Sequence, residues 1–290
     1  IFTNLTRDHL DYHETFEHYG AAKAKLFAMT GLKCAVINID DRFGQKLMTE
    51  IGDDIDLYSY SVDDPDAAIY ASDLQLTQQG ISMHVVTPWG EGELSSQLMG
   101  RFNASNLLAA LAGVVLSDID FDTALKRLSK ASTVAGRMQS FSVDNNPLVV
   151  VDFAHTPDAL EQALGALKGH CQGELWAVFG AGGDRDRSKR PEMGKVVAKI
   201  ADHIVVTSDN PRGENPQQII HEIEKGIPSD CSSHIEENRR TAIEYALAEA
   251  KPEDIVLVAG KGHETGQIFA DRTIEFSDLK VVAEILGVES

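Results

Sequence analysis

Two polar segments of the chain carry residues that could bind a charged amino acid. Asp209-Asn210-Pro211-Arg212 combines a stiff turn, an amide and an arginine, whose planar guanidinium can pair with a carboxylate through two hydrogen bonds. In Gly260-Lys261-Gly262-His263-Glu264 the glycines leave the backbone accessible, and Glu264 offers a negative partner for an ammonium group. Together the segments predict a pocket for a zwitterionic amino acid. The alternative for the first segment is an Asx-turn that leads into a helix.

A third segment, Gly180 to Arg190, begins with closely spaced glycines and continues with a dense run of charged residues. Gly180-Ala181-Gly182-Gly183 lets the backbone approach a ligand closely, and Arg185 lies in the charged run that follows. A tight turn before a solvated helix start explains the same pattern equally well. The segment therefore supports a site for anions only together with the other two.

Residues near the start of the chain suggest a metal ion. His9 stands between carboxylates in Asp8-His9-Leu10-Asp11, and Lys23 lies in the small, apolar stretch Ala21-Ala22-Lys23-Ala24. Burial would lower the pKa of Lys23, and a neutral amine can react with carbon dioxide to give a carbamate, an oxygen ligand suited to Mg²⁺. The alternative is an ordinary solvated lysine on a helix.

Three further residues could contact a nucleotide. Asn103 and Asn106 are three positions apart, so a helix would place them on one face, where they could reach an adenine or ribose or could cap the helix. Arg137 lies in the loop Val134–Met138, where it could reach a phosphate or could be an ordinary linker residue.

The elements that hold the polar segments alternate between strand and helix. Apolar runs lie at Leu148–Phe153, Leu175–Phe179, Ile204–Thr207 and Ile255–Ala259. Helical segments lie between them at Pro157–Leu167, Pro191–Ile200, Pro216–Glu224 and Arg239–Ala250. This alternation predicts an α/β domain with a mostly parallel sheet covered on both faces, and ligands bind beyond the carboxyl ends of the strands in such sheets.

The first half of the chain has a different pattern. A helix is expected around Tyr19–Phe27, a buried strand at Cys34–Asn38, and antiparallel hairpins between Leu57 and Leu98. Further helices are expected over Phe102–Leu116 and Asp122–Leu128. We place a domain boundary in the following loop, which gives domains over residues 1–136 and 137–290.

Composition narrows the choice of partners. The 290 residues carry a net charge of −19, which would repel nucleic acid and anionic membranes, so we expect neither as a partner. The three cysteines are scattered, without the spacing of a zinc site, and fit free thiols in the cytoplasm. No apolar run is long enough to predict a membrane span.

Taken in order along the whole chain, these segments resemble the Mur ligase family of peptidoglycan synthesis. The resemblance is carried by Thr3–Asp11, Ala21-Ala22-Lys23, Asn103–Asn106, Gly136-Arg137-Met138, Val151–Pro157 and the segments at 209–212 and 260–264. It implies that residues 1–136 are the latter part of a central ATP-binding domain. Residues 137–290 would be a complete, Rossmann-like C-terminal domain that binds an amino acid.

The resemblance also implies a reaction and its residues. ATP would phosphorylate the terminal carboxylate of UDP-N-acetylmuramoyl-L-alanyl-D-glutamate, and the amine of meso-diaminopimelate would attack the acyl phosphate, with Mg²⁺ as cofactor and the protein a monomer. By position, Lys23 and His9 would be the catalytic metal-binding residues. The nucleotide would contact Asn106, Arg137, Asp152 and His155. The amino acid would contact Arg185, Asp209, Asn210, Pro211, Arg212, Gly260 and Glu264.

Arg212 indicates which amino acid is used. By resemblance, family members that add lysine differ at this loop and lack the arginine. Meso-diaminopimelate carries a second carboxylate, which lysine lacks. A buried arginine left without that carboxylate would be unpaired, at a cost of about 1–3 kcal/mol or more, so rejection of lysine also follows from the chemistry.

The chain departs from the family pattern in one respect. It contains no G-x-x-x-x-G-K-[ST] phosphate-binding loop, so we expect an N-terminally truncated protein that does not catalyse the reaction alone. Three alternatives stay open: a folylpolyglutamate synthetase of the same architecture, a non-catalytic amino-acid-binding module, and a purely structural protein.

Overall fold

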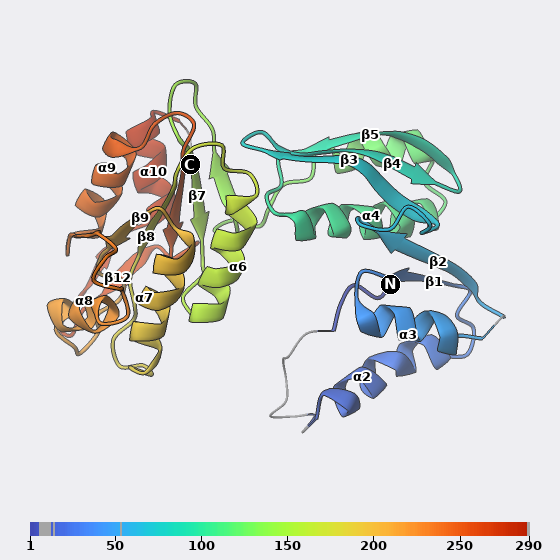
Figure 1. Cartoon of the computed structure of the whole chain (residues 1–290), viewed down its shortest axis with the longest axis horizontal. Coiled ribbons are helices and arrows are strands. Elements are labelled where there is room, and N and C mark those ends of the chain that lie inside the picture. Colours follow the sequence, from blue (N-terminus) through green and yellow to red (C-terminus); the bar gives the residue numbers. More distant parts are fainter. Residues whose placement is uncertain (6–12, 14, 53, 289–290) are drawn as a thin grey trace. The chain divides into compact units, whose positions relative to one another are not determined.

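The computed structural model describes residues 1–5, 13, 15–52 and 54–288, and the chain divides into two compact units (Figure 1). The first unit comprises residues 1–75, 81–97 and 101–131, and the second comprises residues 76–80, 98–100 and 132–290. The continuous part of the second unit begins at Ser132. No helix among the described residues is both long and apolar enough to span a bilayer.

A single sheet organises the described part of the first unit. Its strands follow the order β1 (Cys34–Asn38), β2 (Asp56–Ser61), β3 (Ile69–Thr77), β4 (Gly80–Thr87) and β5 (Gly90–Ser96). The strand at Cys34–Asn38 and the antiparallel β4–β5 hairpin confirm two predictions. The expectation of hairpins from Leu57 onward was wrong for the first part of that range, because β2 pairs in parallel with both β1 and β3. Parallel pairing needs a crossover, and the sequence reading missed the helix that supplies it between β1 and β2.

Three of the helices described in the first unit begin at a side chain that caps them. The described helices of this unit are α2 (Phe16–Ala24), the 3₁₀ turn η1 (Lys25–Ala28), α3 (Arg42–Glu50), α4 (Arg101–Val115) and α5 (Phe121–Leu128). Thr15, Asp41 and Asp120 accept hydrogen bonds from backbone N–H groups in the first turns of α2, α3 and α5. The predicted helices near residues 19–27, 102–116 and 122–128 are therefore present, whereas α3 was not foreseen.

The second unit is a doubly covered, mostly parallel sheet, as predicted. Its strand order is β10 (Ser233–Ile235), β9 (His203–Val206), β8 (Leu175–Phe179), β11 (Ile255–Ala259), β7 (Leu148–Asp152) and β6 (Gln139–Phe141). Neighbouring strands run parallel except β6, which is antiparallel to β7. A small antiparallel pair, β12 (Gly266–Ile268) and β13 (Thr273–Glu275), follows β11.

Helices cover both faces of this sheet (Figure 1). They are α6 (Pro157–Lys168), α7 (Lys189–Ile200), α8 (Pro216–Glu224), α9 (Arg239–Glu249) and α10 (Asp278–Leu286). Alternate residues of one strand enter different cores: Leu148 and Val150 pack with α6–α8, whereas Val149 and Val151 pack with α9 and α10. An uninterrupted apolar strand is the sequence signature of this double burial.

Buried His170, which follows α6, gives the second unit a dependence on pH. Its Nδ1–H donates to the Thr77 carbonyl at 2.7 Å and its Nε2 accepts from the Gly100 N–H at 2.8 Å, so the ring is neutral. Burial lowers the pKa of His170 below its ordinary value of 6.5. The unfolded chain then binds more protons than the native one, and the free energy of unfolding should fall as the pH drops below about 7.

Urea unfolding of the chain between pH 5 and pH 8 checks this expectation. The His170→Gln variant, which does not titrate, should show a flatter profile over the same range. An identical slope in both proteins would contradict the assignment of the pH dependence to His170.

Candidate functional site

Four loops at the carboxyl ends of β7, β8, β9 and β11 enclose a cavity of about 420 Å³ in the second unit. It is lined by Phe153, His155, Thr156, Ala181, Gly182, Arg185, Asp186, Lys189, Arg190, Met193, Asp209, Asn210, Arg212, Gly260 and Glu264. Two of the loops end at helix caps, because Thr156 and Asn215 accept first-turn N–H groups of α6 and α8 and a proline follows each of them. Local sequence thus sets where these loops stop.

Most residues predicted for an amino-acid pocket line this one cavity. They are Arg185, Asp209, Asn210, Arg212, Gly260 and Glu264, together with His155 from the predicted nucleotide set. Pro211 does not line the cavity, but its carbonyl accepts the Glu214 N–H and shapes the turn. His155 and Glu264, which are 109 positions apart in sequence, meet here because parallel strands bring their carboxyl ends to one edge.

Three cations of the cavity have no carboxylate partner within the described residues. Arg185 donates to the Asp184 carbonyl, and Arg212 donates to the Gly183 carbonyl at 3.0 Å. Lys189, which also lines the cavity, forms no ion pair with any residue that the structure describes. In a chain with a net charge of −19, three such cations in one cavity favour an anionic ligand. Arg212 and Arg185 offer the fork that suits a carboxylate or phosphate.

A buried polar cluster holds the other wall of the cavity. The fully buried Lys261 donates to Asn210 Oδ1 and to Glu264 Oε2, both at 3.0 Å. Asn210 Nδ2 donates in turn to the same Glu264 oxygen at 2.8 Å, and Asn210 Oδ1 also accepts the Ile268 N–H. The Asn210 amide therefore has one orientation only, and it fixes Glu264 at the cavity wall.

Glu264 stays ionised in this setting. Burial raises the pKa of its carboxyl, but hydrogen bonds from Asn210 and the charged Lys261 outweigh burial and lower the pKa below 4.5. Its side chain remains 35% exposed, so an arriving ammonium can reach it. The cavity thus presents cations together with the ionised carboxylate of Glu264, which matches a zwitterion.

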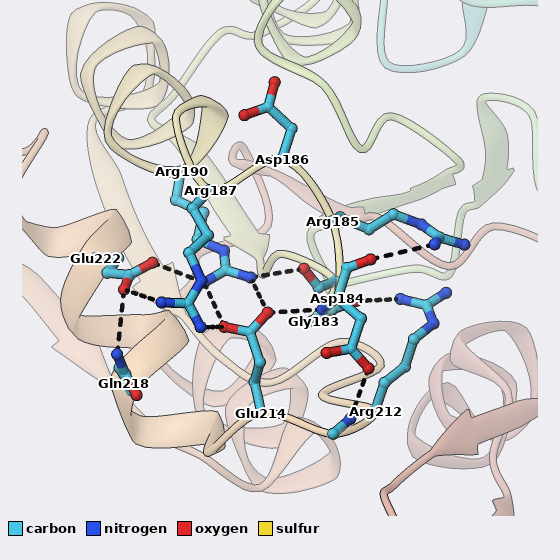
Figure 2. A network of polar contacts seen from close by, with 12 residues as sticks. Gly183, Asp184, Arg185, Asp186, Arg187, Arg190, Arg212, Glu214, Gln218 and Glu222 are labelled. Atoms are coloured by element: carbon cyan, nitrogen blue, oxygen red, sulfur yellow. Dashed lines mark hydrogen bonds and ion pairs between the residues drawn. The ribbon is translucent and has the colours of Figure 1, made fainter.

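The β8 loop, residues 180–188, and the β9 loop, residues 207–215, are bonded to each other at several points (Figure 2). The Gly183 N–H donates to the Asn210 carbonyl, and the Gly213 N–H donates to Asp184 Oδ2. Gly183 cannot carry a side chain, because a Cβ would lie 1.8 Å from the Pro211 carbonyl oxygen. Two residues at this junction, Asp184 (φ 53°) and Arg212 (φ 50°), adopt left-handed backbone conformations. Such strain costs about 1–3 kcal/mol per residue and persists only where the surroundings enforce it.

A buried ion cluster lies beneath this junction. Arg190, which is 1% exposed, forms ion pairs with Glu214 at 2.8 Å and Glu222 at 2.6 Å, and Arg187 pairs with Glu214 at 2.6 Å. The Arg190 guanidinium is the main reason that the pKa of Glu214 falls to about 2. The sequence indicated only a run of charged residues here, because no local pattern predicts that Arg190 pairs with a glutamate 24 positions later.

The predicted nucleotide residues of the second unit surround Phe153. The Arg137 guanidinium stacks on the Phe153 ring at 4.7 Å, and His155 Nδ1–H donates to the Phe153 carbonyl. Both oxygens of Asp152 accept backbone N–H groups, from Met138 and Ala154. Asp152 therefore fastens the loop that carries Arg137, a role the sequence did not reveal.

The predicted residues of the first unit are described only in part. Asn106 Nδ2 donates to Asn103 Oδ1 on α4, so the two do share a face. Lys23 is half-buried on α2, with its ammonium 5.1 Å from the centre of the Tyr19 ring. His9 lies outside the described residues. Within the part of the chain that is described, no three His, Cys, Asp or Glu side chains gather to hold a metal.

Comparisons with known proteins agree with this arrangement of domains. Residues 1–114 match the Mur ligase middle domain, and residues 136–262 match the Mur ligase glutamate ligase domain. A curated protein of Coxiella burnetii, UDP-N-acetylmuramoyl-L-alanyl-D-glutamate--2,6-diaminopimelate ligase, is 47% identical over 290 residues, which are 99% of this chain and 59% of that protein. A protein of the same name from Ectopseudomonas mendocina is 48% identical over 287 residues, again 99% of this chain and 59% of the relative.

A solved structure of a ligase with this name superimposes with a TM-score of 0.80 at 40% identity, covering 98% of this chain and 59% of that one. The chain spans about three-fifths of the length of the curated relatives it matches. Because two Mur ligase domains match in order and long relatives align from end to end of the chain, this protein belongs to the Mur ligase family.

Proposed function

We propose that this chain is part of an ATP-dependent ligase that joins meso-diaminopimelate to UDP-N-acetylmuramoyl-L-alanyl-D-glutamate in peptidoglycan synthesis. The observation that carries the proposal is the cavity of the second unit, where Arg212 has no carboxylate partner among the described residues and Glu264 is ionised. The named activity of the relatives supports it.

In the proposed reaction the terminal carboxylate of the nucleotide substrate takes the γ-phosphoryl group of ATP, and ADP leaves. The amine of diaminopimelate then attacks the acyl carbon, an amide bond forms, and phosphate and a proton are released. The second unit would hold the attacking amino acid. Arg212 would pair with its distal carboxylate, Glu264 would pair with its ammonium group, and Arg185 and Lys189 would neutralise the remaining negative charge.

The nucleotide and metal roles rest on the sequence resemblance. Asn106, Arg137, Asp152 and His155 would contact ATP, and the stacked Arg137–Phe153 pair supports this for one of them. Magnesium would be held by His9 and by a carbamate on Lys23, and would neutralise phosphate charge. We further propose that the protein acts in the cytoplasm as a monomer.

An amino-acid-binding module without ligase activity is the second candidate. The same cavity, with Arg212 and the ionised Glu264, would also serve a module that only binds an amino acid. Diaminopimelate-dependent ATP hydrolysis, in a chain that carries a G-x-x-x-x-G-K-[ST] loop ahead of residue 1, would separate the ligase from the module.

Calorimetric titration of the chain with meso-diaminopimelate and, separately, with L-lysine tests the pocket directly. We expect binding of the first and at least tenfold weaker binding of the second, because a charged group left without its partner costs on the order of 1.5–3 kcal/mol. Equal affinity for the two amino acids, or binding of neither, would count against the proposed substrate.

A further inference from the structure

We propose that Glu214 is a positioning residue that enables the cavity to select an amino acid with a second carboxylate. It would do so by fixing one peptide group of the β8 loop, against which Arg212 is held. This inference rests on the proposed function of the cavity as an amino-acid pocket.

The peptide group in question joins Gly183 to Asp184. Its N–H donates to Glu214 Oε1 at 2.6 Å, and its carbonyl accepts from Arg212 Nη1 at 3.0 Å. One rigid, planar unit thus connects the carboxylate of Glu214 to the guanidinium of Arg212 (Figure 2). A charged acceptor on the N–H also polarises the carbonyl, which strengthens the bond that Arg212 donates.

Glu214 is itself held rigidly. Its side chain is 9% exposed, and Arg190 donates to both of its oxygens, at 2.8 Å and 3.0 Å. Arg187 adds a third donor at 2.6 Å. Four donors, counting the Asp184 N–H, hold the carboxylate in a single position. The carboxylate in turn fixes the position of the Gly183–Asp184 peptide group.

Arg212 needs this support, because its own backbone does not hold it in an ordinary conformation. Its φ is 50°, and its N–H donates to the Ile268 carbonyl at 2.9 Å. The guanidinium lines the cavity, and its hydrogen-bond acceptors among the described residues are the carbonyls of Gly183 and Asn210. If the Gly183 carbonyl moved, the Arg212 side chain could adopt several rotamers. Binding of a carboxylate would then have to restrict Arg212 to one of them, which costs binding free energy.

A plain stabilising role for Glu214 is the competing explanation, and Glu222 provides the matched control. Glu222 also pairs with Arg190, at 2.6 Å, and with Arg187, at 3.8 Å. It makes no hydrogen bond to the β8 loop within the described residues. Replacing either glutamate by glutamine removes one charge from the same two arginines, but only Glu214→Gln disturbs the Gly183–Asp184 peptide.

The experiment is calorimetry of the unmodified chain, Glu214→Gln and Glu222→Gln with meso-diaminopimelate and L-lysine. For Glu214→Gln we expect about a tenfold loss of affinity for diaminopimelate, little change for lysine, and so a smaller ratio between the two. Glu222→Gln should keep the ratio of the unmodified chain. If Glu214→Gln does not fold, Glu214→Asp retains the charge beside Arg190 but has a shorter reach, and the same reduction of the ratio is expected.

Two results would overturn the inference: an unchanged ratio in the Glu214 variant, including an equal loss for both amino acids, or the same reduction of the ratio in Glu222→Gln. If the unmodified chain binds neither amino acid, the proposed function itself fails and this inference fails with it. Binding by the unmodified chain with an unchanged ratio in the variant refutes the role of Glu214 alone.

Discussion

Replacing Arg212 by alanine is expected to weaken binding of meso-diaminopimelate roughly 30-fold or more and to leave L-lysine binding almost unchanged. The guanidinium lies in the cavity without a carboxylate partner among the described residues. Removing one member of a desolvated, hydrogen-bonded charge pair costs about 2–5 kcal/mol of binding free energy. L-lysine has no distal carboxylate that could pair with Arg212, so its binding does not depend on this residue. Calorimetric titration of both amino acids measures the difference.

Two control variants separate charge recognition from other effects. Arg212 has a left-handed backbone, so Arg212→Gly removes the guanidinium without the strain that alanine would keep, and it should show the same loss. Arg272→Ala removes one exposed positive charge from a side chain that packs on Phe269, the bridge partner of Arg212, but Arg272 does not line the cavity. A comparable loss in Arg272→Ala would mean that long-range charge, rather than a direct contact, sets the affinity.

Asp278→Ala should destabilise the second unit by about 3–5 kcal/mol, the largest effect on stability that we expect. Asp278 and Arg239 are fully buried and form two bonds of 2.7 Å, and Arg239 also donates to the Ala259 carbonyl at 2.8 Å. Burial alone would lower the pKa of Arg239, but the charge of Asp278 outweighs it and raises the pKa. Without Asp278 the buried arginine loses both of its hydrogen-bonded carboxylate oxygens, and only the weaker electrostatic interactions with Asp209 and Glu264 are left to it among the described residues.

Urea unfolding followed by Trp176 fluorescence checks this value, because Trp176 is buried in β8 of the second unit. A Trp89→Phe background removes the tryptophan of the first unit. Glu284→Ala is the control, since it breaks the exposed Arg240–Glu284 pair and should cost no more than about 1 kcal/mol. Similar losses of unfolding free energy in both variants would show that the buried pair stabilises the protein no more than the exposed pair does.

Local sequence was enough to predict the second unit's sheet and the loops that form the cavity. Strands such as Leu175–Phe179 and Ile255–Ala259 are apolar along their whole length, because both faces are buried. Caps and prolines such as Thr156-Pro157 and Asn215-Pro216 mark where loops end and helices begin. These signals depend on residues a few positions apart, and they do not require knowledge of the fold.

The hydrogen-bond partners of the side chains in the site could not be predicted from local sequence. Lys261 lies in a glycine-rich loop, yet it is fully buried and orients Asn210 and Glu264. Asp152 bonds the N–H of Met138 with one oxygen, and so fastens a loop that precedes it by 14 residues. Such contacts arise when the strand order β9-β8-β11-β7 brings distant loops to one edge of the sheet.

Residue types and their spacing along the chain therefore determined which loops would carry charge and where the strands and helices would lie. The choice of partner for each charge was made by the tertiary structure. The physical reason is that a buried charge must find its counter-ion in three dimensions, and Arg190 with Glu214 or Arg239 with Asp278 does so across 24 and 39 positions. No pattern of neighbouring residues predicts a contact between residues so far apart in the sequence.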